Sequence, residues 1–165
     1  MVIVQISRGV GPGWAIVDAM RYAEEYDNPY FYVDGMSCPD AKNRAVEIAD
    51  KFEDDLLLIE DDIRASQQTW HAIQTYSSPD AIVTATTNKR TGKSNLTRAP
   101  NGKFLATGTV FVKIPRTVYT RLEAPVFRPW TFARTADGDE IIDRGPCKSG
   151  HGSDWYFWYT ARQLK

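Results

Sequence analysis

The chain has 165 residues, enough to bury a core, and this length favours a single domain over residues 1–165. Hydrophobic residues make up 42% and charged residues 25%, as in ordinary globular proteins. The net charge of −1 gives no global argument for binding nucleic acid or membranes. The two cysteines, Cys38 and Cys147, lack metal-ligand spacing and are interpreted as free thiols.

The first half of the chain alternates predicted strands and helices. Pro39 suits the first turn of a helix, and Ser66 is a candidate helix cap. The alternation favours an α/β fold with a mostly parallel sheet, in which ligands bind beyond the carboxyl ends of the strands. We expect strands at 2–6, 29–35, 55–60 and 81–85, and helices at 14–26, 38–52 and 66–76.

The second half has weaker patterns. Residues 87–103 form a polar stretch with five basic side chains and are expected to be a long loop. A strand interrupted by Gly108 is predicted at 104–114, followed by a short helix that Pro115 opens. Residues 123–152 are expected to be irregular, and a helix at 153–164 has Ser153 as its candidate cap.

No apolar stretch reaches the length of a membrane span. The start, "MVIVQISRG", lacks the basic segment and the long apolar run of a signal peptide. We therefore expect a cytoplasmic protein with no membrane span.

The stretch "LLLIEDDI" drives a predicted buried strand into three carboxylates, Glu60, Asp61 and Asp62. Like charges at about 4 Å repel by about 1 kcal/mol in water and by more in a poorer dielectric. A divalent cation such as Mg²⁺ or Mn²⁺ would relieve this repulsion. Because residues i and i+2 of an extended chain point the same way, Glu60 and Asp62 are expected to face one site and Asp61 the other. The alternative is an exposed turn with solvated acids.

The motif "LLLIEDDI" resembles the acidic signature of GT-A fold nucleotide-sugar glycosyltransferases, in which an apolar strand ends in Asp-x-Asp or Glu-Asp-Asp. "FYVDG", "AKNRAVEIA", "LATGTVFVKIPRTVYTRL" and "GHGSDWYFWYTAR" are similar to other elements of that family. The resemblance implies a three-layer α/β/α sandwich with a mostly parallel central sheet. It also implies Mn²⁺ or Mg²⁺ as the cofactor.

The resemblance assigns roles to individual residues. It implies that Asp62 is a direct metal ligand and that Asp154 is the catalytic base of an inverting enzyme. His151 is a candidate second metal ligand or diphosphate contact; a solvated histidine is the alternative. Asp154 in the first turn of a helix also has a purely electrostatic explanation. The candidate nucleotide-sugar-binding residues are Arg8, Asp34, Glu60, Asp61 and Gly108.

We therefore expect a metal-dependent glycosyltransferase that moves a sugar from a nucleotide-diphosphate sugar to a hydroxyl of a glycan, a protein or a modified nucleic acid. Trp130 and Trp155 are candidates for stacking on a sugar ring, with core packing as the alternative. Three other functions stay open: a nucleotidyltransferase of similar layout, a non-catalytic nucleotide-sugar-binding module and a metal-dependent nuclease.

Overall fold

The structure, a computed structural model, describes residues 1–7, 9, 13–85, 96–138, 140–147 and 152–164. The chain divides into two compact units. The first unit comprises Met1–Ala85 and Thr109–Arg121, and the second comprises Thr86–Gly108 and Leu122–Lys165. The single domain expected over residues 1–165 stays a prediction.

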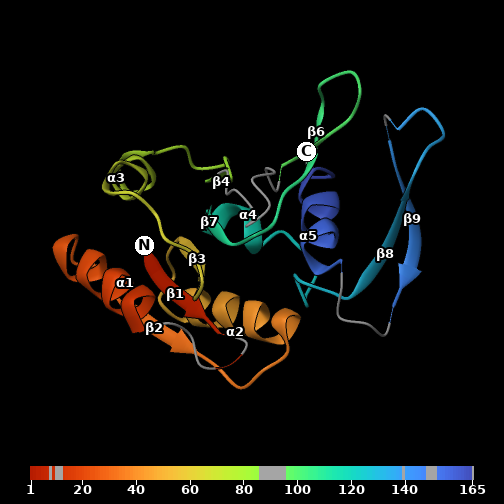
Figure 1. Cartoon of the computed structure of the whole chain (residues 1–165). Helices are drawn as coiled ribbons and strands as arrows, with labels where there is room; N and C mark the ends of the chain where they lie inside the picture. The colour runs from red at the N-terminus through yellow and green to blue at the C-terminus, as the bar shows by residue number, and fades with distance from the viewer. Residues whose placement is uncertain (8, 10–12, 86–95, 139, 148–151, 165) are drawn as a thin grey trace. The chain divides into compact units, whose positions relative to one another are not determined.

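A five-stranded mixed sheet forms the centre of the first unit, in the order β2-β1-β3-β7-β4 (Figure 1). β1 runs parallel to both β2 and β3, whereas β7 runs antiparallel to β3 and β4. The prediction of an α/β fold is confirmed at the level of a mixed sheet with helices. The strands are β1 (Val2–Ile6), β2 (Tyr30–Val33), β3 (Leu56–Glu60), β4 (Val83–Thr84) and β7 (Phe111–Ile114).

The three long helices of the first unit lie within one residue of their predicted ends. Ser66 caps α3, as predicted, by accepting a hydrogen bond from the backbone N–H of Thr69 at 3.2 Å. Ser37 caps α2 in the same way, with Pro39 in its first turn. The helices of this unit are α1 (Gly13–Glu25), α2 (Cys38–Lys51), α3 (Gln67–Thr75) and the short α4 (Arg116–Tyr119).

The two faces of the sheet are covered by different helices. On one face, Ile3 and Leu57 pack in a cluster with Tyr22 of α1 and Trp70 of α3, whose rings stack at 4.5 Å. Successive side chains of a strand point to opposite faces. The intervening residues of β1 and β3 therefore face α2, whose contact stripe consists mainly of the small residues Ala41, Ala45 and Ala49.

The second unit contains a β-hairpin that the sequence did not predict. Residues 123–152 were expected to be irregular, but β8 (Trp130–Arg134) pairs antiparallel with β9 (Ile141–Pro146). The connecting turn needs Gly138, whose φ of +76° is costly for other residues. The predicted strand 104–114 is also divided: β6 (Phe104–Ala106) pairs with β5 (Thr97–Arg98), whereas β7 belongs to the first unit.

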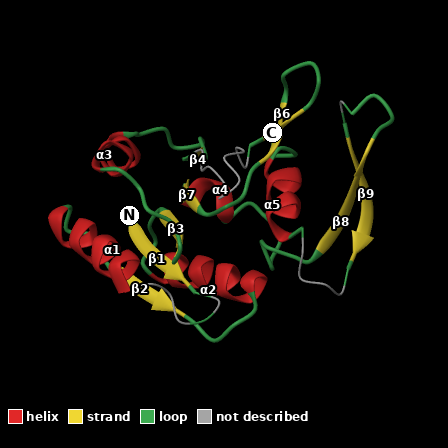
Figure 2. Cartoon of the chain, in the orientation of Figure 1, coloured by secondary structure: helices red, strands yellow, loops and turns green. Residues whose placement is uncertain are grey.

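The helix α5 (Ser153–Ala161) is drawn in red in Figure 2. Its five aromatic residues are consecutive in the sequence, so they lie on more than one side of the helix. Phe157 stacks on Phe127 at 4.9 Å, and the indole N–H of Trp158 donates to the carbonyl oxygen of Thr107 at 2.8 Å. These contacts form the core of the second unit. Trp155 and Tyr159 lie one helical turn apart and stay half-buried.

The predicted cap of α5 is wrong by one residue. Ser153 is the first helical residue and is buried, and Gly152 occupies the cap position with φ +84°. A Cβ atom at Gly152 would lie 2.0 Å from the carbonyl oxygen of Trp130. Only glycine permits this approach of the helix start to β8, so packing rather than side-chain capping fixes where α5 begins.

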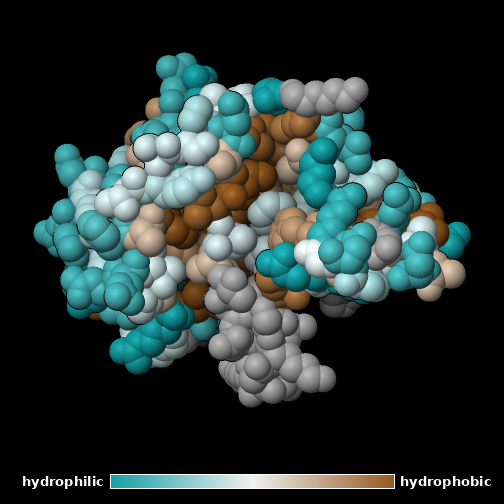
Figure 3. Space-filling model, turned by 90° about the horizontal axis from the view of Figure 1, so that it is seen from above, coloured by the Kyte–Doolittle hydropathy of each residue, from teal (hydrophilic) through white to brown (hydrophobic). Residues whose placement is uncertain are grey.

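Across the described residues, no helix is both long and apolar enough to cross a membrane. Hydrophilic residues, in teal, cover much of the outer part of the face drawn in Figure 3.

Candidate functional site

The carboxyl ends of three strands meet at one edge of the sheet in the first unit. Ile6 is in register with Val33 of β2 and with Glu60 of β3. The hydrogen bonds continue one residue further, because the N–H of Ser7 donates to Val33 at 2.9 Å and the N–H of Asp61 donates to Ile6 at 3.0 Å. The side chains that follow β1 are therefore neighbours of those that follow β2 and of those that follow β3, and all three sets lie at the same end of the sheet. We call this set the acidic edge: Ser7, Asp34, Glu60, Asp61 and Asp62.

Glu60 points to the face covered by α2 and forms an ion pair there. Its carboxylate lies 3.0 Å from the ammonium group of Lys42, and its side chain is only 12% exposed. Lys42 is fully buried and also donates a hydrogen bond to the hydroxyl of Thr109 at 2.8 Å. Since a lysine is almost never fully buried without partners, the charge of Glu60 accounts for the position of Lys42.

Lys42 was missed by the sequence analysis, although a signal was present. It lies beside Ala41 in the stripe that continues through Ala45 and Ala49, so helical spacing places it on the buried side of α2. Burying an unpaired charge is costly in free energy, so a charged residue in a buried apolar stripe predicts a partner of opposite charge. Glu60, at the end of the adjacent strand, is that partner.

Asp61 points to the opposite face, as the alternation predicted for this pair. The hydroxyl of the buried Ser7 donates a hydrogen bond to its carboxylate. Gln5 follows on the same face of β1; it is fully buried, and the Tyr30 hydroxyl donates to its side-chain oxygen at 2.7 Å. Burial, with the nearby Tyr32, raises the pKa of Tyr30 to about 12. Asp61 is thus hydrogen-bonded to the end of a row of buried polar side chains, Gln5 and Ser7, on this face of β1.

Asp62 differs from its two neighbours. It lies in the turn after β3, and its side chain is exposed. Within the ranges that the structure describes, its carboxylate makes no hydrogen bond or ion pair. Asp62 therefore has a carboxylate available to a ligand, whereas Glu60 and Asp61 are already bonded to groups of the fold. That Glu60 and Asp62 face one site stays a prediction.

The residues present are compatible with a hard divalent cation. No cluster of three or more metal-ligating side chains occurs among the described residues. Mg²⁺, however, commonly uses only one or two carboxylates and takes its other oxygens from substrate phosphates and water. Asp62 supplies an exposed oxygen donor of the required type.

The other candidate residues fall in several places. Asp34 is exposed directly after β2, and the half-buried Gly108 precedes Thr109, the partner of Lys42. Asp154 is half-buried in the first turn of α5, in the second unit. Arg8 and His151 lie outside the described residues.

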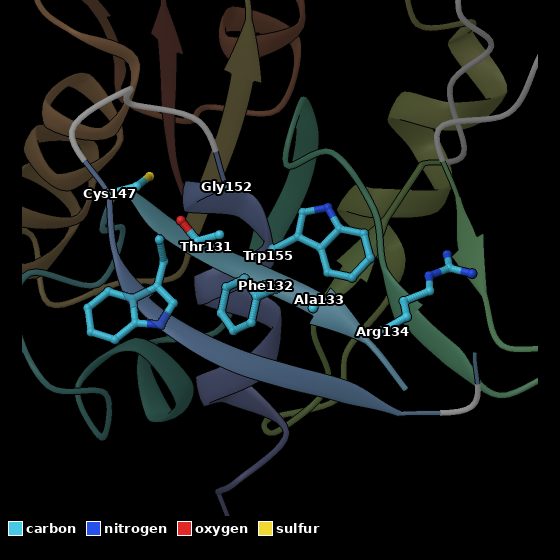
Figure 4. A pocket seen from close by; sticks show the side chains of 8 residues that line it. Thr131, Phe132, Ala133, Arg134, Cys147, Gly152 and Trp155 are labelled. Carbon is cyan, nitrogen blue, oxygen red and sulfur yellow. The ribbon is translucent and has the colours of Figure 1, made fainter. Parts of the chain in front are cut away.

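The second unit holds a cavity of about 500 Å³ between the hairpin and the start of α5. Figure 4 shows Phe132, Trp155 and Arg134 along this cavity, with Thr131 and Cys147 near its other end. Trp130 and Gly152 also line it. The sequence indicates Trp130 and Trp155 as candidates for stacking, but the cavity could not be predicted from it, because the cavity depends on a hairpin that was not predicted.

No family model matches the chain, and no curated protein matches it. Among solved structures, the fold is similar to the crystal structure of A197 from STIV, a viral protein. The two chains share 16% sequence identity and superpose with a TM-score of 0.59, over 98% of this chain and 78% of that one. At this level of identity the similarity establishes the fold alone.

Proposed function

We propose that the chain is a divalent-metal-dependent glycosyltransferase with a GT-A-like, three-layer α/β/α fold. It would move a sugar from a nucleotide-diphosphate sugar to an acceptor hydroxyl. The observation that carries this proposal is the acidic edge, where an exposed Asp62 follows a buried parallel strand and Asp34 follows another strand at the same end of the sheet. Such edges are where α/β sheets bind ligands.

The acids of the edge would have separate tasks. Asp62 would hold Mn²⁺ or Mg²⁺ together with oxygens of the donor diphosphate. A bound divalent cation supplies charge neutralisation for a leaving diphosphate. The ion pair of Glu60 with Lys42 and the hydrogen bond of Asp61 with Ser7 fix these two carboxylates, which would orient the donor ribose or the water ligands. Asp34 would accept hydrogen bonds from the nucleoside.

Asp154 would act as the general base on the acceptor hydroxyl. It lies in the first turn of α5, half-buried, and the resemblance to glycosyltransferases gives it this role. A general base must carry a group that accepts the proton of the acceptor hydroxyl, and a carboxylate can do so. Substituting Asp154 with Asn would therefore stop transfer and leave donor binding intact.

A second candidate is a nucleotide-sugar-binding module without catalysis. It is favoured by the partners of Glu60 and Asp61, because Lys42 and Ser7 let the fold tolerate two of the three acids without a cation. This candidate predicts ligand binding that EDTA leaves unchanged. A nucleotidyltransferase would instead release pyrophosphate from nucleoside triphosphates.

Hydrolysis of nucleotide-sugar donors tests the proposal. We expect the protein to release nucleoside diphosphate from at least one UDP-, GDP- or dTDP-sugar in the presence of Mn²⁺, and Asp62→Asn to remove this activity. Asp80→Asn is the matched control, because Asp80 is equally an exposed acid but precedes β4, at the opposite edge of the sheet. Equal rates for the two variants would reject the role of Asp62.

A further inference from the structure

This cavity of the second unit is lined by aromatic rings that remain partly accessible to solvent. Trp130, Phe132 and Trp155 are all half-buried, whereas Phe127 and Phe157 fill the core beneath. A folded chain usually buries large aromatic side chains more completely, and aromatic rings that line a concave surface are typical of ligand sites. The cavity volume of about 500 Å³ lies within the range of small-molecule sites, about 300–1,000 Å³.

These rings are held in place before any ligand binds. The indole N–H of Trp130 donates to the carboxylate of Asp143 on the facing strand at 2.5 Å, and its ring lies 4.9 Å from that of Tyr156. The ring of Phe132 lies 6.4 Å from that of Trp155 with an angle of 29° between the planes. Since the rings are already oriented, a ligand would lose little free energy in ordering them.

The charge of the hairpin argues against a polyanionic ligand. Residues 130–146 contain two arginines and four acidic residues. Proteins that bind single-stranded nucleic acid combine aromatic platforms with a positively charged groove. Among the described residues that line the cavity, the aromatic platform is present and Arg134 is the single basic side chain. A neutral ligand with one flat apolar face and many hydroxyl groups fits better, since Arg134 and Thr131 supply hydrogen-bond donors at the rim.

We propose that this cavity binds a carbohydrate, and that the acceptor of the reaction is therefore a glycan. A pyranose ring has an apolar C–H face that would stack on Trp155 and Phe132, with its hydroxyls toward Arg134. Gly152 and Trp155, which both line the cavity, flank Asp154 in the sequence. The part of this inference that makes the bound carbohydrate the acceptor of a transfer reaction rests on the proposed function.

Binding of neutral oligosaccharides to the full chain tests this inference. Cellotetraose, chitotetraose and maltotetraose would be titrated by saturation-transfer NMR, in EDTA and without a donor. We expect at least one to bind, and Trp155→Leu or Phe132→Leu to weaken its affinity about tenfold or more. Leucine keeps apolar volume, so these variants should stay folded. Trp14→Leu is the matched control, because Trp14 is 44% exposed but belongs to the first unit, and it should leave the affinity unchanged.

Three results would overturn the inference. The first is that none of the three sugars binds. The second is that binding is lost equally in the Trp14 and Trp155 variants. The third is that a thymidine decanucleotide binds through Trp155 while the sugars do not, which would make the ligand a single-stranded nucleic acid. Because the titration needs neither metal nor donor, sugar binding without donor hydrolysis would support the carbohydrate site and reject the glycosyltransferase.

Discussion

Replacing Lys42 with Met tests the ion pair that anchors the acidic edge. The ammonium of Lys42 is fully buried and lies 3.0 Å from the carboxylate of Glu60, which is 12% exposed. At this distance and an effective dielectric constant of about 20, the attraction is about 5.5 kcal/mol before desolvation is subtracted. Removing one partner of a buried pair typically costs about 3–5 kcal/mol, because the other charge loses its compensation. We therefore expect Lys42→Met to lower the free energy of unfolding by about 3–5 kcal/mol.

Urea unfolding followed by circular dichroism measures this loss. With a slope of about 2 kcal/mol per molar urea, the midpoint should fall by about 2 M. The double variant Lys42→Met, Glu60→Leu should recover most of the stability, since replacing both charges with apolar groups is often neutral. Lys51→Met, an exposed site at the end of the same helix, should change the free energy by less than about 0.5 kcal/mol. A loss below about 1 kcal/mol for Lys42→Met, or a double variant no more stable than the single one, would refute the reasoning.

Three further predictions concern packing and buried hydroxyls. Tyr30→Phe removes the donor to the buried Gln5 and should cost about 1–3 kcal/mol in urea unfolding; an unchanged midpoint would show that water replaces the hydroxyl. Burial raises the pKa of both Tyr30 and Tyr119 to about 12, while unfolded tyrosines ionise near pH 10. The neutral hydroxyls of these tyrosines therefore contribute fully to the free energy of unfolding below about pH 10, and this contribution is lost as the pH rises towards 12. The melting temperature, measured at a series of pH values, should therefore fall between pH 10 and pH 12. A melting temperature that stays constant up to pH 12 would contradict this expectation. Gly152→Ala places a Cβ 2.0 Å from the carbonyl oxygen of Trp130 at φ +84° and should cost about 3 kcal/mol or more, so a melting temperature equal to that of the original chain would argue against this packing.

The first half of the chain, in which strands and helices alternate, could be predicted because the apolar patterns and the helix-capping residues agree there. Residues 55–60 form an apolar run without alternation, as expected for a strand buried on both faces, and Ser66 caps the helix that follows. What the sequence did not predict is the place of β7 between β3 and β4, which makes the sheet mixed. The order of strands in a sheet is a long-range property that local periodicity does not encode.

The hairpin and the cavity were missed for a related reason. Trp130, Thr131 and Phe132 are residues that favour strands, but Pro129 and the Gly-rich and Asp-rich stretch after Arg134 favoured an irregular segment. These strand-favouring residues were the usable signal, and the turn around Gly138 joins the two strands of the hairpin. Aromatic residues in a hairpin can face either a core or a ligand, and only the position of α5 distinguishes these outcomes.

The acidic edge was predicted in part. The sequence correctly separated Glu60 from Asp61 by alternation, and the structure adds the partners Lys42 and Ser7. Lys42 was 18 residues away from Glu60 in the chain and could be found only from its place on the buried stripe of α2. These partners explain how a buried strand tolerates its acidic end, and they leave Asp62 as the acid that a ligand would meet.

Calorimetric titration of nucleoside diphosphates is the most direct test of the central claim, that the acidic edge binds a metal–diphosphate complex through Asp62. UDP, GDP, ADP, CDP and dTDP would be titrated into the protein with Mn²⁺ and, separately, with EDTA. The account predicts that at least one binds only with Mn²⁺, and that Asp62→Asn abolishes this binding while Asp80→Asn preserves it. Binding of equal strength in EDTA, or in the Asp62 variant, would contradict the account.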